Sequence, residues 1–176
     1  MPRRHPLPHR WLMTDERLGD ALLPIVAKVP RGSGVVFRHY ATPEGERRRM
    51  FTQVRRIARA RRLVLLVAGP VLPGSDGVHG RKVLRGKGLV TRPVHSIPER
   101  VAAERAGADA IFVSPVFATA SHPGARALGR VRFQRLIRGA RVPVIALGGM
   151  TAARARTLKG IAGWAAIDAW ASESRA

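Results

Sequence analysis

The sequence predicts an α/β fold with a parallel sheet, and two observations lead to this prediction. Short apolar runs recur along the chain, and most are continuous instead of alternating with polar residues, as expected for strands buried on both faces. Stretches with helix start and stop signals lie between several of these runs, and such alternation is typical of a parallel sheet. The predicted strands span residues 11–14, 35–38, 63–67, 77–79, 89–94, 110–113, 142–147 and 164–167.

Capping residues place four helices between these strands. Thr42, Ser96 and Thr151 stand where an N-cap side chain would accept the first free backbone N–H groups. Proline follows in the first turn of two of these helices, where its missing N–H does no harm. Glycines that can end a helix follow the last three: Gly107, Gly139 and Gly160. The predicted helices span residues 43–60, 97–106, 131–138 and 152–159.

Eight strands suggest a closed barrel, with an open doubly wound sheet as the alternative. Periodicity alone does not choose between the two. The chain has 176 residues and is short for a barrel. Residues 69–75 and 80–88 look like loops, so the helices after strands 3 and 4 are expected to be shortened or missing. No GxGxxG or P-loop pattern favours an open nucleotide-binding sheet.

Composition limits the class of protein. Hydrophobic residues make up 45% of the chain, which excludes a disordered tail, and its length fits one domain. We predict a basic, flexible lead at residues 1–10 and a single domain over residues 11–176. No apolar run approaches the roughly 20 residues of a membrane span, so no membrane partner is expected. The absence of cysteine excludes disulfides and thiolate sites and fits the cytoplasm.

A net charge of +21 first indicates a nucleic-acid-binding protein. However, the basic residues are spread along the chain, with short clusters only at 47–49, 55–56 and 59–62. Aromatic residues make up 5% of the chain, too few for a stacking platform. We therefore rank nucleic acid last among the expected partners, although the positive field would attract any small anion.

The second half of the chain carries an ordered series of motifs. The series is Val-His-Ser at 94–96, AERAGAD at 103–109, SPVFAT at 114–119 and PVIALGGM at 143–150, with weaker matches at 12–15, 36–38 and 76–79. It resembles the thiamine phosphate synthase family and its sister group, the thiazole tautomerases, over nearly the whole chain. The resemblance implies a compact (β/α)8 TIM barrel with its ligand at the carboxyl ends of the strands.

The resemblance also implies two alternative chemistries. A thiamine phosphate synthase joins an aminopyrimidine pyrophosphate to a thiazole phosphate with the help of Mg²⁺. A thiazole tautomerase moves a proton on a carboxythiazole phosphate. Either activity predicts a small phosphorylated thiazole or pyrimidine as the ligand, and a homodimer stays open.

Gly148 and Gly149 are the candidate phosphate site. They follow a predicted strand and precede Thr151, and glycine lets backbone N–H groups approach an anion closely. The alternative is a tight turn without a ligand. The family shares this role with the end of the last strand, which corresponds to Ile167 and Asp168. An aspartate facing a phosphate would repel it, so this position departs from the family pattern.

Arg38 matches an arginine that contacts pyrophosphate in the family, and a guanidinium suits that role. The alternative for Arg38 is a salt bridge at the barrel mouth. The metal-binding acids of the family correspond to Ala68-Gly69 and to residues 81–84, which hold no carboxylate. Mg²⁺ prefers carboxylate and phosphate oxygens, so no cofactor and no metal ligand is assigned here, although the family implies Mg²⁺.

His95 is the candidate catalytic residue. It matches the proton shuttle of the tautomerases, and imidazole titrates near neutral pH. Further ligand-binding candidates are Thr119, Ser121 and His122 in the loop after strand six, and His79 at the end of strand four. Each has a plain alternative, an ordinary polar loop or a structural histidine.

Four functions therefore stay open from the sequence. They are a thiamine phosphate synthase with a divergent active site, a tautomerase-like proton-transfer enzyme, a non-catalytic binder of a phosphorylated ligand, and a nucleic-acid-binding protein. Whether the protein turns over a substrate is what separates the first two from the third.

Overall fold

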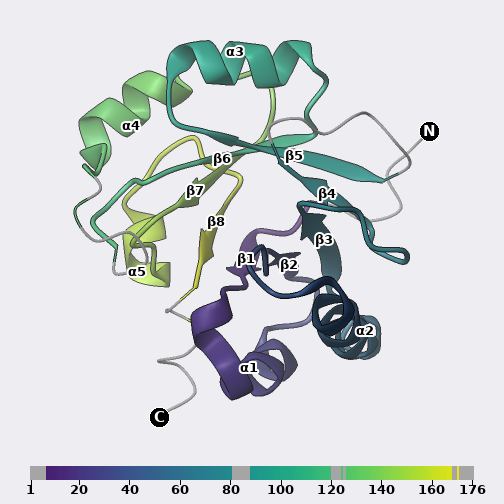
Figure 1. Ribbon diagram of the computed structural model, residues 1–176. Coiled ribbons are helices and arrows are strands. Elements are labelled where there is room, and N and C mark those ends of the chain that lie inside the picture. The colour runs from purple at the N-terminus through teal and green to yellow at the C-terminus, as the bar shows by residue number, and fades with distance from the viewer. Residues whose placement is uncertain (1–6, 81–87, 120–123, 125, 168–169, 171–176) are drawn as a thin grey trace.

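Eight parallel strands close into a barrel in the computed structural model, which describes residues 7–80, 88–119, 124, 126–167 and 170 (Figure 1). The strands pair in chain order, and β8 pairs with β1 to complete the ring. The prediction of a (β/α)8 barrel is therefore confirmed, and the open-sheet alternative is wrong. The strands are β1 Arg10–Met13, β2 Gly34–Phe37, β3 Val64–Ala68, β4 Gly77–His79, β5 Leu89–Val94, β6 Ala110–Val113, β7 Val144–Leu147 and β8 Gly163–Ala166.

Helices cover the outside of the ring between several strands. α1 packs against α2, and α3 packs against α4 (Figure 1). The helices are the 3₁₀ helix η1 Glu16–Ala21, then α1 Leu22–Lys28, α2 Glu44–Ala60, α3 Ile97–Arg105, α4 Gly129–Ile137 and α5 Ala152–Arg156. Residues 69–76 between β3 and β4 form no helix, as predicted. The predicted loop after β4 lies mostly outside the described residues.

Alternate strand residues point into the barrel and out toward the helices. The inner set forms its own buried cluster, which includes Trp11, Val36 and Phe112. Close packing inside the ring explains one glycine: a Cβ at Gly34 would lie 2.1 Å from the Trp11 ring. The outer residues join a larger core with the helices, for example where Phe37 meets Phe51 of α2 edge to face.

The capping predictions are only partly correct. The side chains of Ser96 and Thr151 accept hydrogen bonds from the third residue of α3 and α5, as expected for N-caps. Thr42 does not cap α2, because Pro43 occupies the N-cap position and no side chain bonds there. α5 also ends at Arg156, three residues earlier than predicted.

The first connection of the barrel holds helices that the sequence analysis missed. α1 has three buried residues, Leu22, Ile25 and Val26, at the spacing of one helix face. Its proline stands at Pro24, within the first turn, where a free backbone N–H is not needed. Among the described residues, no helix is both long and apolar enough to span a membrane.

Candidate functional site at the carboxyl ends of the strands

The closed parallel ring brings most of the predicted site residues to one edge of the barrel. Arg38 follows β2, His79 ends β4, His95 follows β5 and Gly148 follows β7. Parallel strands in a ring have all their carboxyl ends at one mouth, so these residues share that mouth. Gly149, Ile167 and Thr119 follow β7, β8 and β6 at the same edge. The candidates Ser121, His122 and Asp168 lie outside the described residues.

Arg38 is held by groups at the end of β1. Its Nε donates to the Thr14 carbonyl at 2.8 Å, and its Nη2 donates to Asp15 at 3.1 Å. The Thr14 hydroxyl accepts the Arg38 backbone N–H at 3.0 Å and lies 3.0 Å from Nδ1 of His39. Both members of the ion pair are partly exposed. The described contacts are therefore those of a barrel-mouth salt bridge, and contact with a ligand stays a prediction.

Asp15 is kept charged in this arrangement. Its burial raises the pKa, but hydrogen bonds and positive charge from Arg17 and the charge of Arg38 outweigh burial, so the pKa lies below its usual value. A permanent negative charge at the end of β1 thus neutralises Arg38. Any anion that binds Arg38 must compete with Asp15 for the guanidinium.

Arg47 of α2 is a buried residue that the sequence analysis did not single out. It donates to three main-chain carbonyls, those of His39 at 2.9 Å, Ala68 at 2.7 Å and Pro70 at 3.2 Å. These bonds tie the ends of β2 and β3 together. The signal was present in the sequence, because Arg47 precedes Phe51 by one helical turn on the buried face of α2.

The Mg²⁺ that the family resemblance implies does not fit the residues at this end of β3. Positions 68 and 69 are alanine and glycine, and the Ala68 carbonyl accepts from the Arg47 guanidinium instead. A fixed positive charge beside a carbonyl opposes the binding of a cation. Within the described part of the chain, no group of three His, Cys, Asp or Glu side chains could hold a metal ion.

His79 lies inside the barrel. Its Nδ1 is 2.9 Å from the Thr91 hydroxyl, and its ring meets Phe112 edge to face at 4.9 Å between centroids. Burial, and to a lesser degree the charge of Arg38, lowers the pKa of His79 to about 3. His79 is therefore neutral at physiological pH, and its described contacts are those of a core residue.

His95 is exposed, and its Nδ1 lies 2.7 Å from the Ser114 carbonyl and 3.4 Å from the Ser114 hydroxyl. Because a carbonyl can only accept, the shorter contact is a hydrogen bond when Nδ1 carries the proton, and in the neutral ring Nε2 then has the lone pair. Among the described residues, no hydrogen bond involves Nε2. The backbone N–H of His95 donates to Glu99 at 2.6 Å, which fixes the strand end to the first turn of α3. The arrangement presents one ring nitrogen as a base.

Gly148 and Gly149 both have positive φ angles, 94° and 58°. Their glycine identity is required by the loop after β6, because a Cβ at Gly149 would lie 2.3 Å from the Ala118 carbonyl oxygen and one at Gly148 would lie 2.7 Å from Pro115 Cα. Phe117 N–H donates to the Gly148 carbonyl at 3.1 Å, so the two loops are joined through their backbones. This packing accounts for both glycines, and phosphate binding stays a prediction.

A parallel ring of eight strands, with polar groups at its carboxyl ends, defines a (β/α)8 barrel of the kind that binds small ligands at the mouth. Residues 12–170 match the model of the family described as thiamine monophosphate synthase. The chain therefore belongs to that family.

Individual relatives agree with this family. The chain is 28% identical to a putative thiamine-phosphate synthase 2 of Aquifex aeolicus over 161 residues, which cover 82% of this chain and 87% of the relative. It is 27% identical to a thiamine-phosphate synthase of Caldivirga maquilingensis, over 80% of this chain and 76% of the relative. A solved thiamine phosphate pyrophosphorylase from Pyrococcus furiosus superposes with a TM-score of 0.76 at 23% identity, over 90% of this chain and 85% of that chain.

Proposed function

We propose that this barrel binds a thiazole phosphate at its mouth and moves a proton on the thiazole ring through His95, without a metal ion. The single observation that carries the proposal is the His95 geometry, with Nδ1–H given to the Ser114 carbonyl and Nε2 presented as a base. General acid–base catalysis by one positioned side chain contributes about 10²–10⁴-fold in rate.

Each residue has a stated role in this proposal. His95 takes a proton from one ring position and returns it to another, so the imidazole ends the cycle as it began. The Ser114 carbonyl stabilises the imidazolium in between, because it accepts from Nδ1 in both protonation states. The backbone around Gly148 and Gly149 holds the phosphate, with Ile167 as an apolar neighbour at the end of β8.

Thiamine phosphate synthesis is the second candidate, supported by the family model and by the names of the relatives. In that reaction, the thiazole nitrogen forms a bond to the pyrimidine methylene as pyrophosphate leaves. Arg38 is a described cation at the mouth that suits pyrophosphate, but it is already paired with Asp15. Arg154, which lies beside Gly149, already donates to the Gly149 carbonyl. The residues at the end of β3 do not supply the carboxylates that a Mg²⁺ ion would need.

Two assays separate the candidates. The first follows deuterium exchange from solvent into a carboxythiazole phosphate in the presence of a chelator, and the second follows thiamine phosphate formation from both family substrates with and without Mg²⁺. We expect exchange that survives the chelator and falls at least about 100-fold in His95→Gln. Unchanged exchange in that variant would refute the role of His95, and Mg²⁺-dependent coupling would establish the synthase instead.

A binding measurement covers the third possibility, a non-catalytic binder. Carboxythiazole phosphate at 100 times its dissociation constant should stabilise the fold by about 2.7 kcal/mol. Stabilisation of this size without exchange or coupling would indicate a ligand sensor. We also propose that the protein works in the cytoplasm, in line with its lack of cysteine.

A further inference from the structure

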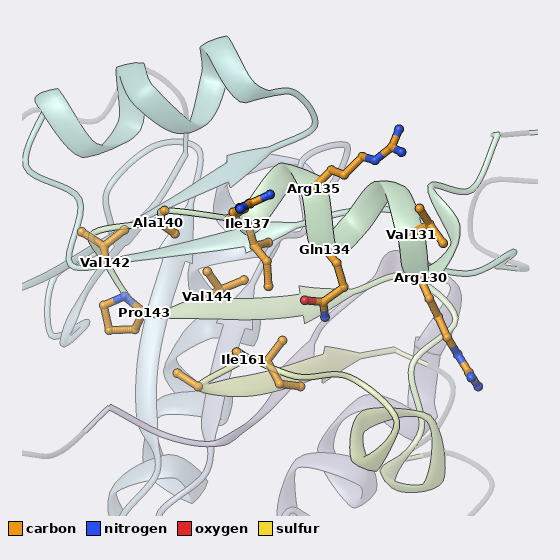
Figure 2. A pocket seen from close by; sticks show the side chains of 14 residues that line it. Arg130, Val131, Gln134, Arg135, Ile137, Ala140, Val142, Pro143, Val144 and Ile161 are labelled. Carbon is orange, nitrogen blue, oxygen red and sulfur yellow. The ribbon is translucent and has the colours of Figure 1, made fainter.

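A groove on the outside of the barrel lies at the end opposite the proposed ligand site. It runs between α4 and the segments that enter β7 and β8, and has a volume of about 900 Å³. Figure 2 shows Ile137 and Gln134 extending from α4 toward Val144 of β7 and Ile161 before β8. We call it the α4 groove. The lining residues outside α4 and the turn after it, 142–144 and 160–162, lie at the amino ends of β7 and β8, so an occupant there would leave the mouth free.

The α4 groove lies beside the β7–β8 connection, which contains only a short helix. In a (β/α)8 barrel, a helix after each strand covers the outer face of the sheet. α5 has five residues, whereas α3 and α4 have nine each. The rest of the connection, residues 157–162, contains no helix. The groove beside α4 lies next to this connection.

The shape of the groove is fixed by contacts within the chain. The Gln134 amide donates to the Lys159 carbonyl at 2.9 Å, which holds α4 at a set distance from the turn before β8. Gly160 stands against Ile137, since a Cβ there would lie 3.6 Å from the Ile137 Cδ1 atom. The partly exposed apolar residues of the floor are Val142, Pro143 and Ile161, which lie beside the buried Ile137 and Val144.

The rim of the groove is basic. Arg130, Arg135 and Arg138 of α4 and its C-cap contribute to the lining, and all three are exposed. Figure 2 shows Arg130 and Arg135 extending outward from α4, where long side chains can fold over an occupant. No acidic side chain is among the residues that line the groove. An apolar floor with a cationic rim complements an amphipathic helix that carries acidic residues beside its apolar face.

We propose that the α4 groove docks an acidic amphipathic helix of another protein. A second copy of this chain fits poorly, because 32 basic residues face 11 acidic ones and two basic surfaces repel each other. Nucleic acid fits poorly as well, because the floor offers aliphatic side chains and no aromatic ring for bases to stack on.

A labelled synthetic helix tests the proposal directly. The probe is a peptide of about 15 residues, with leucines at i, i+3, i+4 and i+7 and glutamates on the remaining positions. Two control peptides have lysine in place of glutamate, or the same residues in scrambled order. Fluorescence anisotropy with the full chain should show binding of the probe, weaker at high salt, and at least about tenfold weaker binding of both controls.

Matched variants locate the binding surface. Replacing Arg130, Arg135 and Arg138 together by glutamine should weaken the probe at least about tenfold, and Ile161→Ala should weaken it several-fold. The control replaces three exposed arginines of α2 (Arg48, Arg56 and Arg59) by glutamine, which removes the same charge far from the groove. This control should change binding less than about threefold.

Several results would overturn the proposal. If the α4 triple variant and the α2 control variant lose equal amounts of peptide binding, the overall positive field of the protein, and not the groove, attracts the peptide. The same conclusion would follow if the scrambled peptide bound as tightly as the probe. Loss of self-association in Ile161→Ala would assign the groove to a second copy, and loss of RNA binding in the α4 triple would assign it to nucleic acid. Thermal unfolding of each variant checks that it is folded.

Discussion

The two halves of the barrel mouth use their polar groups differently. At the ends of β1, β2 and β3, side chains bind each other or main-chain carbonyls, as Arg38 does with Asp15 and Arg47 with three carbonyls. At the ends of β5, β6 and β7, backbone bonds join the loops after β6 and β7, and Arg154 donates to the Gly149 carbonyl. His95 bonds the Ser114 carbonyl through Nδ1, and no described hydrogen bond involves its Nε2. Groups that are already paired must give up a partner to bind a ligand. This comparison supports our proposal that the reactive part of the mouth lies in the second half.

Removal of the Arg47 guanidinium should destabilise the first half of the mouth, where it joins the ends of β2 and β3. In Arg47→Met an unbranched apolar side chain replaces the arginine, but the contact of the guanidinium with the Phe37 ring is lost and three carbonyls lose their donor. Unsatisfied buried groups cost about 1–3 kcal/mol each, so we expect a loss of about 3 kcal/mol or more in the free energy of unfolding. Urea unfolding measures it.

The neighbouring arginine provides the control for this prediction. Arg48 is exposed and pairs with Glu44 one turn away, so Arg48→Met should cost less than about 0.5 kcal/mol. A similar, small loss in both variants would show that the carbonyls of the first half find other donors and that Arg47 does not hold β2 and β3 together.

A methyl group at Gly149 should destabilise the second half of the mouth, where the loops after β6 and β7 pack together. In Gly149→Ala the new Cβ meets the Ala118 carbonyl, and the backbone stays at a φ of 58°. The left-handed conformation costs about 1–2 kcal/mol, and a forced contact in a packed region adds about 1–3 kcal/mol. We expect a loss of about 3 kcal/mol in the free energy of unfolding.

Gly139→Ala separates the two contributions. Gly139 also has a positive φ, 74°, but a Cβ there meets nothing within 4 Å. Gly139→Ala should therefore lower the free energy of unfolding only by the cost of the left-handed backbone conformation, about 1 kcal/mol. If both alanine variants unfold at the same urea concentration, the loops after β6 and β7 are not packed as closely as described.

Strand positions were predictable from the sequence because most strands are short, continuous runs of apolar residues. All eight were placed within a few residues of their observed ends. Caps were predictable where one side chain decides the matter, as at Ser96 and Thr151. Thr42 failed because Pro43 adopts the extended N-cap conformation itself and moves the helix start by one residue.

Side-chain pairing at the mouth was not predictable, because it depends on contacts between distant segments. Arg38 and Asp15 are 23 residues apart in the chain, and only the β1–β2 pairing brings them together. The hydrogen bond of His95 Nδ1 likewise depends on the carbonyl of Ser114, directly after β6 and 19 residues away. The motifs located these residues at the mouth. Only the three-dimensional contacts show that Arg38 is paired with Asp15 and that His95 uses Nδ1 to bond a carbonyl.

His79, on β4 between the two halves, should make the fold sensitive to acid. Its folded pKa of about 3 lies below the ordinary value of 6.5, so the unfolded chain binds the proton more readily. Stability is then fully present above pH 6.5 and is lost as pH falls from 6.5 toward 3. The slope approaches about 1.4 kcal/mol per pH unit for one proton. The pKa of His39 is also lowered by burial, which adds a contribution of the same sign.

His79→Gln tests this origin of the slope. Glutamine can still bond the Thr91 hydroxyl, but it does not titrate. Urea unfolding between about pH 4.5 and 6.5 should show a shallower slope in the variant, with the difference approaching one proton. Parallel slopes for the two proteins would show that His79 keeps an ordinary pKa and is hydrated.

The smallest expected effect is on the affinity for an anion at Arg38. In Asp15→Asn the guanidinium loses its charged partner but keeps the Thr14 carbonyl, so it becomes available to an anion. A partly exposed pair of this kind is worth about 1 kcal/mol or less, so the dissociation constant of a carboxythiazole phosphate should fall by up to about fivefold. Isothermal titration calorimetry measures the change, and Arg17→Gln is the control, since it removes the other cation on Asp15 and leaves the Arg38 pair in place. An unchanged dissociation constant in Asp15→Asn would show that the phosphate lies beyond the reach of Arg38, entirely within the second half of the mouth.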